Sequence, residues 1–252
     1  MADDRPAAQI PGDFDPVPFK TRTADLPIRL ASAAMMLAVL FLALWLGGQA
    51  LDTFIYLVAL IGFVEFMLLV FKATPRFFVR FPAVIAGAFY FGCAASIMTG
   101  AGTFLLVLVI GVTVATDTGA YFAGRAIGGP KIAPSISPSK TWAGLAGGMI
   151  ASAAWVFVWV MAIDAPFDAW LGPRFELGLN LSFQNLVGAA LLGAGLAVVA
   201  QAGDFFESWL KRRAGVKDSS RLIPGHGGVF DRIDSLIPVA IVAGFVATQM
   251  VG

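Results

Sequence analysis

The residues most able to carry chemistry lie between positions 204 and 234, where acids, bases and glycines are close together in the sequence. Asp231 and Asp234 lie about one helical turn apart, and Asp204 ends the apolar stretch that precedes them. The same segment contains six basic residues: Lys211, Arg212, Arg213, Lys217, Arg221 and Arg232. Mg²⁺ is typically held by one or two carboxylates, with substrate phosphates and water completing its shell. This combination therefore indicates a magnesium-dependent site for a phosphate-bearing ligand.

The same segment contains a glycine-rich loop, Pro224-Gly225-His226-Gly227-Gly228. Glycines let backbone N–H groups approach a ligand closely, so Gly227 and Gly228 are candidate phosphate contacts. His226 is the only histidine of the chain and a candidate catalytic residue. A phosphate nucleophile is already ionised near neutral pH, because its second pKa is about 6. We therefore expect His226 to contact phosphate or fix the loop, and a general-base role is the alternative.

The first part of the segment is predicted to be helical. On a helix, Asp204, Ser208, Lys211 and Arg212 share one face. A plain alternative exists, because Glu207 and Lys211 are spaced as an ordinary i,i+4 ion pair and basic residues are common where a helix leaves a membrane. That alternative leaves the acids and the glycine loop downstream unexplained.

Two further acids lie within strongly apolar stretches, where a carboxylate is costly and marks a functional candidate. Asp117, Tyr121 and Arg125 recur every four residues and form a stripe along one helical face. That stripe is either part of the site or a structural polar seam. For Glu65, in Phe63-Val64-Glu65-Phe66, a functional role and a hydrogen-bond anchor between helices are equally open.

A serine-rich stretch, Ser135-Ile136-Ser137-Pro138-Ser139-Lys140-Thr141-Trp142, is predicted to begin a helix. Ser137 suits the N-cap and Pro138 suits the first helical position. Backbone N–H groups at this helix start, the hydroxyls of Ser137 and Thr141, and Lys140 would together form an anion site. The simpler interpretation is a helix start alone.

The elements that must position these residues are apolar helices. The chain has 252 residues, 58% of them hydrophobic and 13% charged, whereas soluble domains are about 45–50% apolar. A bilayer core about 30 Å thick needs about 20 apolar residues per crossing. Seven stretches qualify: 30–48, 51–71, 81–98, 102–123, 141–163, 183–203 and 236–252. We therefore predict an all-α, polytopic membrane bundle of about seven helices, with seven to nine allowed.

The distribution of Lys and Arg predicts how this bundle is oriented. Of the 17 Lys and Arg residues, all but Arg174 lie in segments that seven alternating spans place on one side: the N-terminal end, 72–80, 124–140 and 204–235. Positive residues accumulate in cytoplasmic loops, so this side is predicted to be cytoplasmic and to carry the site. The outer 164–182 loop is expected to be a connector. The predicted divisions are a cytoplasmic polar tail (1–27), N-terminal membrane helices (28–100) and a catalytic membrane domain (101–252).

Several other classes of function fit poorly. The net charge is only +1 and no basic tract has interleaved aromatic residues, which argues against a nucleic-acid partner. Cys93 is the single cysteine, so the sequence offers neither a disulfide nor a thiolate metal cluster. Transporters usually place polar groups at mid-membrane in broken helices and often contain repeats. Here the charges lie at the ends of the spans and no repeat is evident.

These motifs resemble the phosphatidate cytidylyltransferases, or CDP-diacylglycerol synthases. Twelve residues match that family's signature at its spacing: Ser208, Lys211, Arg212, Lys217, Asp218, Pro224, His226, Gly227, Gly228, Asp231, Arg232 and Asp234. The Asp-x-Gly-Ala-Tyr-x-x-Gly-Arg stretch at 117–125 and the Ser-Pro-x-Lys-Thr-Trp stretch at 137–142 are also similar to the family. Ser139 stands where a second Lys is usual, and Ala143 where an acid is common, which bears on how this loop holds the nucleotide.

The resemblance implies that CTP and phosphatidate react to give CDP-diacylglycerol and pyrophosphate, with Mg²⁺ and room for a second cation. Under this hypothesis, Asp204 and Asp231 hold the metal. Five cations would stabilise charge on pyrophosphate and headgroup: Lys140, Lys211, Arg212, Lys217 and Arg232. Three acids would hold those cations or the metal shell in place: Asp117, Asp218 and Asp234. Arg125 joins the substrate-binding candidates through its place in the matching stretch.

The main alternative is a CTP-dependent kinase of a polyprenyl or phytyl alcohol. That reaction deprotonates an alcohol, which would favour His226 as the general base. A CDP-alcohol phosphotransferase is disfavoured because its Asp-Gly…Ala-Arg…Asp…Asp array is missing from the sequence. Small residues such as Gly87 and Gly92 allow close approach of membrane helices, so a homodimer is also possible. The expected location is a bacterial inner membrane, with the site facing the cytoplasm.

Overall fold

The computed structural model describes residues 26–161 and 183–251. Within these ranges, six helices are long and apolar enough to cross a membrane: α2 (Leu26–Leu46), α3 (Gly48–Ala73), α4 (Phe77–Gly100), α5 (Gly102–Ala126), α6 (Trp142–Met161) and α8 (Phe183–Arg213). A seventh apolar helix, α10 (Leu236–Val251), follows the short helix α9 (Phe230–Ile233). The predicted all-α, polytopic membrane bundle is confirmed.

The last predicted span is shorter than expected. Helix α10 has 16 residues, which gives a length of about 24 Å, less than the roughly 30 Å hydrocarbon core. The described bundle therefore combines six long spans with one short apolar helix. The connector predicted at 164–182 lies outside the described residues, and so does the tail predicted at 1–27 except for positions 26 and 27.

Two glycine turns join successive long helices. Gly47 separates α2 from α3 with a φ of 60°, and Gly102 opens α5 with a φ of 76°. Residues with a Cβ avoid such positive φ values, so glycine allows the chain to reverse within one residue of a helix end. The turns keep α2 next to α3 and α4 next to α5.

A small β-hairpin replaces the helix start predicted at Ser137. Strand β1 (Lys131–Ala133) pairs antiparallel with β2 (Ser137–Thr141), and α6 begins only at Trp142. The predicted N-cap role of Ser137 is therefore wrong. The cap is Thr141, whose Oγ1 accepts a hydrogen bond of 3.0 Å from the N–H of Gly144. Pro138 lacks an N–H but is tolerated on a two-stranded hairpin, where each strand has one unpaired edge.

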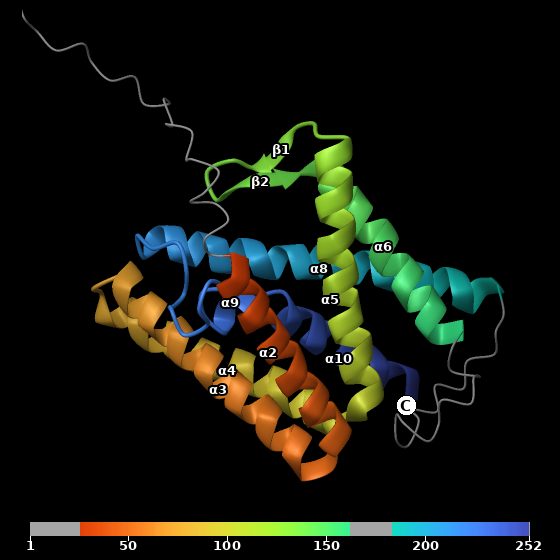
Figure 1. The fold of residues 1–252 in the computed structure, drawn as a ribbon, viewed down its shortest axis with the longest axis horizontal. Coiled ribbons are helices and arrows are strands. Elements are labelled where there is room, and N and C mark those ends of the chain that lie inside the picture. The colour runs from red at the N-terminus through yellow and green to blue at the C-terminus, as the bar shows by residue number, and fades with distance from the viewer. Residues whose placement is uncertain (1–25, 162–182, 252) are drawn as a thin grey trace, which may run out of the picture.

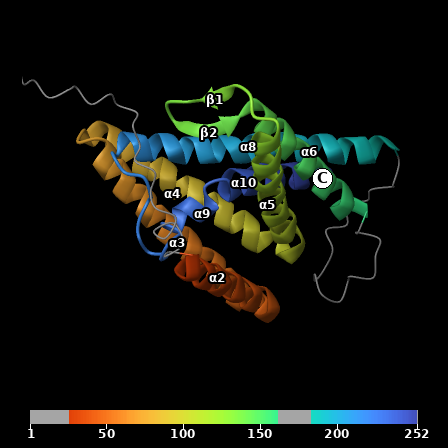
Figure 2. The same ribbon diagram turned by 45° about the horizontal axis from the view of Figure 1, so that its top comes forward.

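Three groups of helices build the frame around the site. In Figure 1, α3 and α4 lie side by side, α5 and α6 form a second pair, and α8 crosses behind the α5–α6 pair. The turned view keeps this arrangement, with the hairpin over α8 near the end of α5 (Figure 2). Helix α10 packs against α4, α5 and α8, so helices on both sides of the predicted division at residue 100 share one core.

Aromatic packing fixes the short helix α9 beneath this frame. Phe230 is 1% exposed, and its ring centroid lies 5.9 Å from that of Phe66 and 5.4 Å from that of Phe91. Rings at these separations pack favourably in edge-on or tilted geometry. Because Phe230 is so tightly held, the residues that follow it, Asp231 and Arg232, have a defined position.

Candidate functional site

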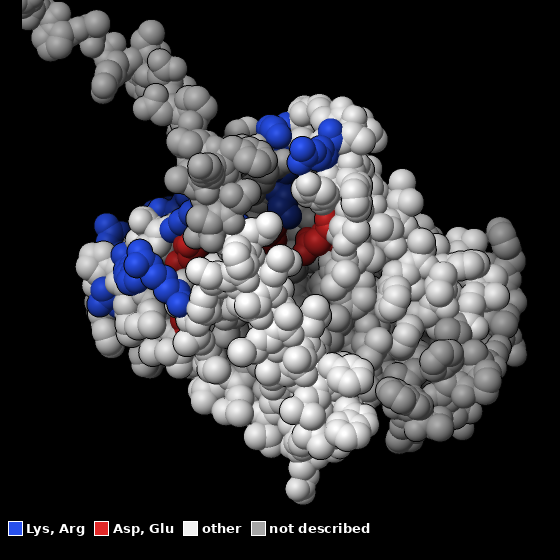
Figure 3. All heavy atoms as spheres, in the orientation of Figure 1, with Lys and Arg blue, Asp and Glu red and all other residues white. Residues whose placement is uncertain are grey.

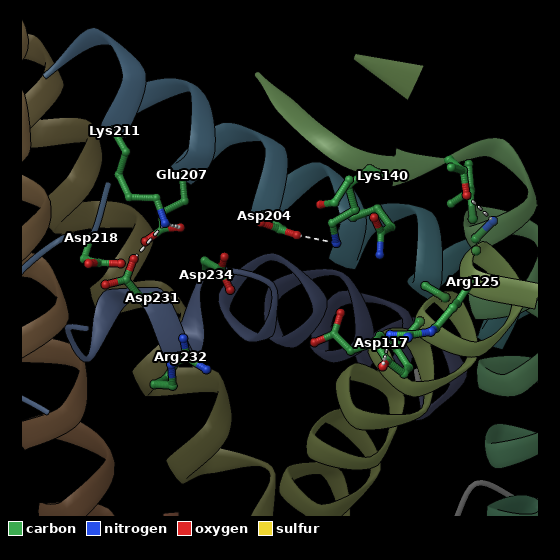
Figure 4. A pocket seen from close by; sticks show the side chains of 18 residues that line it. Asp117, Arg125, Lys140, Asp204, Glu207, Lys211, Asp218, Asp231, Arg232 and Asp234 are labelled. Carbon is green, nitrogen blue, oxygen red and sulfur yellow. Dashed lines mark hydrogen bonds and ion pairs between the residues drawn. The ribbon is translucent and has the colours of Figure 1, made fainter. Parts of the chain in front are cut away.

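A cavity of about 590 Å³ gathers the charged residues predicted from distant parts of the sequence. Its lining comes from α5, β2, the first turn of α6, α8 and α9, together with Asp218 and Asp234. Ten charged side chains line it: Asp117, Arg125, Lys140, Asp204, Glu207, Lys211, Asp218, Asp231, Arg232 and Asp234 (Figure 4). Thr141 and Ser139 also belong to the lining. Six carboxylates and four cations thus surround one space at the end of an apolar bundle.

The charges are segregated on the molecular surface. Figure 3 shows acidic side chains inside a hollow whose surroundings carry Lys and Arg, while the face below is almost free of charge. Charged groups are costly at bilayer depth and accumulate where helices leave the membrane. The hollow therefore lies where the bundle meets water.

Seven predicted site residues lie outside the lining of this cavity: Ser137, Ser208, Arg212, Lys217, His226, Gly227 and Gly228. Two of them support it from nearby. The Ser208 hydroxyl donates to Asp204 Oδ1 over 3.3 Å, and Arg212 Nε donates to the Ile136 carbonyl over 3.4 Å. Arg212 thereby ties the hairpin to α8. Direct contacts of these seven residues with substrate stay predictions.

His226 is directed toward helix α2. Its Nδ1 lies 2.8 Å from the Ser32 hydroxyl, and its backbone N–H donates to the Ile223 carbonyl over 3.0 Å. The loop also closes on itself, because the Ile223 N–H donates to the Gly227 carbonyl over 2.8 Å. These contacts agree with the expectation that His226 fixes the loop.

Lys211 links the two helices that carry the acids. From α8, its Nζ lies 2.5 Å from Glu207 Oε2 and 2.7 Å from Asp231 Oδ1 on α9. The Lys211 side chain is 15% exposed, against 1% and 5% for those two carboxylates. A buried ion pair of this kind is costly to break, because the remaining charge loses its partner. Lys211 therefore fixes the position of α9 relative to α8 beside the cavity.

Asp231 is saturated with hydrogen bonds. In addition to Lys211 at Oδ1, its Oδ2 accepts from the N–H of Ser219 at 2.9 Å and from the N–H of Gly228 at 2.7 Å. Burial acts to raise the pKa of Asp231, but its hydrogen bonds with Glu207, Lys211 and these backbone groups outweigh that effect and hold the pKa below its ordinary value. Asp231 therefore stays ionised and shapes the glycine loop around itself.

The loop needs glycine at position 227 for this arrangement. Gly227 has a φ of 83°, and a Cβ at this position would lie 2.6 Å from Asp231 Oδ2. A side chain would therefore face both an unfavourable backbone conformation and a clash. In this structure the N–H of Gly228 binds a carboxylate of the protein, so its contact with a phosphate remains a prediction.

Glu65 anchors the other side of the same loop. Its carboxylate on α3 accepts hydrogen bonds from the backbone N–H groups of Val229 (3.2 Å) and Phe230 (2.7 Å) and from the hydroxyl of Ser220 (2.6 Å). The hydroxyl of Ser219 lies within hydrogen-bond distance of both Glu65 and Asp231. Of the two roles left open for Glu65, these contacts support the anchor.

Three carboxylates converge differently, in a way suited to a metal ion. Asp204, Glu207 and Asp234 each offer one oxygen, and these oxygens lie within 4.8 Å of one another. Glu207 Oε1 is buried without a hydrogen-bond partner among the described residues. Burial, followed by the charge of Asp204, raises the pKa of Asp234 to about 7. Lys140 and Lys211 pair with Asp204 and Glu207, yet one Glu207 oxygen stays without a partner among the described residues. Three converging acids with such an oxygen fit a divalent cation with oxygen ligands.

This cluster differs from the predicted metal pair of Asp204 and Asp231. Asp204 belongs to it, whereas Asp231 has its oxygens engaged by Lys211, Ser219 and Gly228. Glu207 was missed because its i,i+4 spacing to Lys211 already explained it. The available signal was its i,i+3 spacing from Asp204, which places both acids on one face of α8.

The opposite wall of the cavity is basic. Lys140, from β2, forms an ion pair with Asp204 Oδ2. Arg125 Nη1 donates to the Tyr121 hydroxyl over 3.1 Å, at the end of the stripe that begins with Asp117. The stripe is therefore part of the site lining. The cations on this wall and the acids on α8 and α9 face the same space, which suits a metal-bound polyphosphate.

Comparison with known proteins decides the family. A sequence profile described as the cytidylyltransferase family matches residues 71–249, which include every residue of the cavity. The chain belongs to the cytidylyltransferase family. Its matched region extends well upstream of residue 117, where the sequence motifs begin, and includes all of α4 and α5.

Curated bacterial members of the cytidylyltransferase family are similar to this chain. A phosphatidate cytidylyltransferase of Brucella suis is 42% identical over 161 residues, 62% of this chain and 53% of the relative. Enzymes of the same name from Haemophilus influenzae (42% over 135 residues, 54% of this chain and 42% of the relative) and Rickettsia felis (37% over 150 residues, 60% and 61%) also match. The chain thus spans about half the length of the curated relatives it matches.

Proposed function

We propose that this protein transfers CMP from CTP to phosphatidate, which gives CDP-diacylglycerol and pyrophosphate for phospholipid biosynthesis. The observation that carries the proposal is the cavity itself, in which four cations and six carboxylates meet at the end of an apolar bundle. A lipid phosphate reaches such a place from the bilayer, and CTP reaches it from water. Relatives named phosphatidate cytidylyltransferase support the same assignment.

The charge of the cavity supports a divalent cation as cofactor. Both substrates are anionic, yet the acids in the lining outnumber the bases. Asp204, Glu207 and Asp234 would hold Mg²⁺, and Asp117 lines the same cavity, where a second cation could be held. When bound, Mg²⁺ supplies charge neutralisation and orientation of the triphosphate. In this assignment, Asp231 positions Lys211 instead of binding the metal.

In the proposed reaction, a phosphate oxygen of the lipid forms a bond to the α-phosphorus of CTP. The bond from that phosphorus to the bridging oxygen of the β-phosphate breaks, and pyrophosphate leaves with the electron pair. The attacking oxygen is already ionised near neutral pH, so no residue needs to remove a proton. Positioning and charge stabilisation are the main tasks of the protein.

The cations of the cavity suit these tasks. Lys211, held by Glu207 and Asp231, lies beside the acidic cluster and would stabilise charge on the departing pyrophosphate. Lys140 is paired with Asp204, so metal binding at Asp204 would release its ammonium group toward a phosphate. Arg125 and Arg232 line other parts of the cavity. Arg212 and Lys217, outside the lining, would act at its edge.

The proposed location is a bacterial inner membrane, with the cavity on the cytoplasmic side. The segregation of Lys and Arg at one end of the bundle supports this orientation, because positive residues accumulate in cytoplasmic loops. The names of bacterial relatives support the type of cell. CTP is made in the cytoplasm, so this orientation also gives the nucleotide access.

The test is a transfer assay with the purified protein in detergent, phosphatidate, Mg²⁺ and CTP labelled at the α-phosphate. Label in a CDP-lipid, lost when EDTA is added, is the expected result. A parallel reaction with CTP labelled at the γ-phosphate and a polyprenyl alcohol tests the kinase alternative. Label in the alcohol and none in phosphatidate would overturn the proposal.

A further inference from the structure

A second cavity, of about 440 Å³, lies next to the charged one and has the opposite character. Its walls come from α2, α3, α4 and α5 together with residues between 223 and 237. Apart from Thr113 and Arg232, every residue that lines it is apolar. Its volume falls in the roughly 300–1,000 Å³ range of ligand pockets. Such a space suits a hydrocarbon chain.

Arg232 belongs to both cavities. It lines the charged cavity with Asp204, Lys211 and Asp234, and it lines the apolar cavity with Ile233 and Ile237. A guanidinium group at the boundary between a polar and an apolar space is suited to an anionic headgroup whose tail lies on the apolar side. The two cavities and this shared residue thus match the two ends of an anionic lipid.

The apolar cavity is bordered by side chains that face outward from the bundle. Met35 on α2 is 69% exposed and Val114 on α5 is 59% exposed, although both line the cavity. Helix α2 packs chiefly on α3, and Met35 and Val114 place α2 and α5 at the border of the cavity. In a membrane, exposed apolar side chains on membrane-spanning helices contact lipid tails. An acyl chain could therefore enter sideways from the bilayer.

We propose that the apolar cavity receives an acyl chain of the phospholipid substrate while Arg232 binds its phosphate, which presents that phosphate to the charged cavity. This inference rests on the proposed function for the identity of the lipid. The occupant is a phosphatidate acyl chain, because Arg232 complements a phosphate monoester at the point where the two cavities meet. The cavity would then select substrates by chain length as well as by headgroup.

The first test fills the cavity with a larger side chain. Ala59, on α3, is half-buried and lines the cavity, so Ala59→Phe shortens the space for a chain. Ala88→Phe, at an exposed position of α4 outside the lining, is the matched control. We measure kcat/KM for phosphatidates with 18-carbon and 6-carbon chains at saturating CTP. The ratio of long-chain to short-chain kcat/KM should fall at least about tenfold in Ala59→Phe, because each methylene kept from burial costs about a factor of four.

The control should keep the wild-type ratio. An unchanged ratio in Ala59→Phe, or an equal fall in Ala88→Phe, would overturn the acyl-chain assignment. The proposed function fails separately, because a wild-type protein that forms no CDP-lipid from either substrate would refute the reaction itself.

The second test uses the wild-type protein and so does not depend on how a variant folds. A phosphatidate with a photoreactive diazirine in its acyl chain is crosslinked in detergent, and the labelled positions are mapped by mass spectrometry. Labelling should concentrate on residues that line the apolar cavity, such as Met35, Ala59 and Val114, and should be competed by unlabelled phosphatidate. A phosphatidylcholine probe with the same chains should label these residues several-fold less. Equal labelling by both probes would mean that bulk lipid fills the cavity and would overturn the proposal.

Discussion

Two groups of carboxylates lie within the same bundle and differ in what surrounds them. Around the 219–230 loop, Glu65 and Asp231 accept hydrogen bonds from backbone N–H groups, serine hydroxyls and Lys211. In the acidic cluster on α8 and beside α9, Asp204, Glu207 and Asp234 face one another instead. The first group accepts mainly from backbone N–H groups and serine hydroxyls. In the second group, two acids pair with lysines, Asp234 accepts from the Ser235 N–H, and one Glu207 oxygen has no partner among the described residues.

This difference distinguishes carboxylates that stabilise the fold from carboxylates that bind a metal ion. A buried carboxylate with a full set of donors is stabilised as an anion and fixes the backbone around it. A group of converging carboxylates that keeps an orphaned oxygen beside its lysine partners is stabilised further when a metal cation joins it. The surroundings of an acid thus indicate whether it serves the fold or an ion, although the residue type is the same.

The largest effect should follow from Asp204→Asn, which removes a proposed metal ligand and the partner of Lys140. We expect CDP-lipid formation to fall by more than about 100-fold, beyond the roughly 10–100-fold typical of residues that only support a ligand. Asp52→Asn, in α3 and outside the cavity lining, is the control and should keep wild-type activity. Both proteins should retain the same unfolding temperature in detergent. Activity within tenfold of the wild type would remove Asp204 from the metal site.

A smaller effect is expected from Asp231→Asn, which tests the carboxylates around the 219–230 loop. Its loss leaves Lys211 with Glu207 alone and removes the acceptor that organises the glycine loop. Activity should fall by about 10–100-fold, with membrane insertion intact. The Mg²⁺ concentration that gives half-maximal activity should stay the same. A large rise in that concentration would place Asp231 among the metal ligands, as the sequence predicts.

Glu65→Gln should affect stability more than catalysis. The amide keeps one acceptor but turns a donor toward N–H groups that need an acceptor, at a cost of about 1–3 kcal/mol. The unfolding temperature should therefore fall. At temperatures well below unfolding, kcat/KM should change less in Glu65→Gln than in Asp231→Asn. A cycle with Ser220→Ala, which removes the 2.6 Å hydrogen bond to Glu65, measures the coupling. Strictly additive effects would contradict the anchor role.

The bundle was largely predictable because long apolar stretches have few structures open to them in a membrane. The Asp117–Arg125 stripe and the α8 face with Asp204 and Lys211 were also predictable, since both depend only on helical spacing. The hairpin at 131–141 was not, because Ser137 and Pro138 suit a helix start as well as they suit a short strand. The strand pairing supplies the information that local propensity lacks.

The parts of the site that the sequence did not reveal depend on contacts between distant residues. Glu65 meets Phe230 across 165 positions, and no periodicity marks such a pair. The distinction between Asp231 and Asp234 is similar, because both follow the same loop and differ only in the donors that the folded chain brings to them. Spacing identified most acids of the site but not Glu207, and tertiary contacts indicated the role of each.

The smallest effect should follow from His226→Gln, which sharpens the contrast between loop-fixing residues and residues of the cavity. The ring faces Ser32 on α2 and lies outside the cavity lining, and glutamine can still hydrogen-bond to a hydroxyl. We expect CDP-lipid formation to fall less than about tenfold, since loss of a general base typically costs about 10²–10⁴-fold. The measurement is kcat with phosphatidate, compared with Ser32→Ala, which removes the other half of the contact. If kcat fell a hundredfold or more in His226→Gln but not in Ser32→Ala, the histidine would act on substrate. That result would favour the alternative reaction, in which an alcohol is deprotonated and phosphorylated.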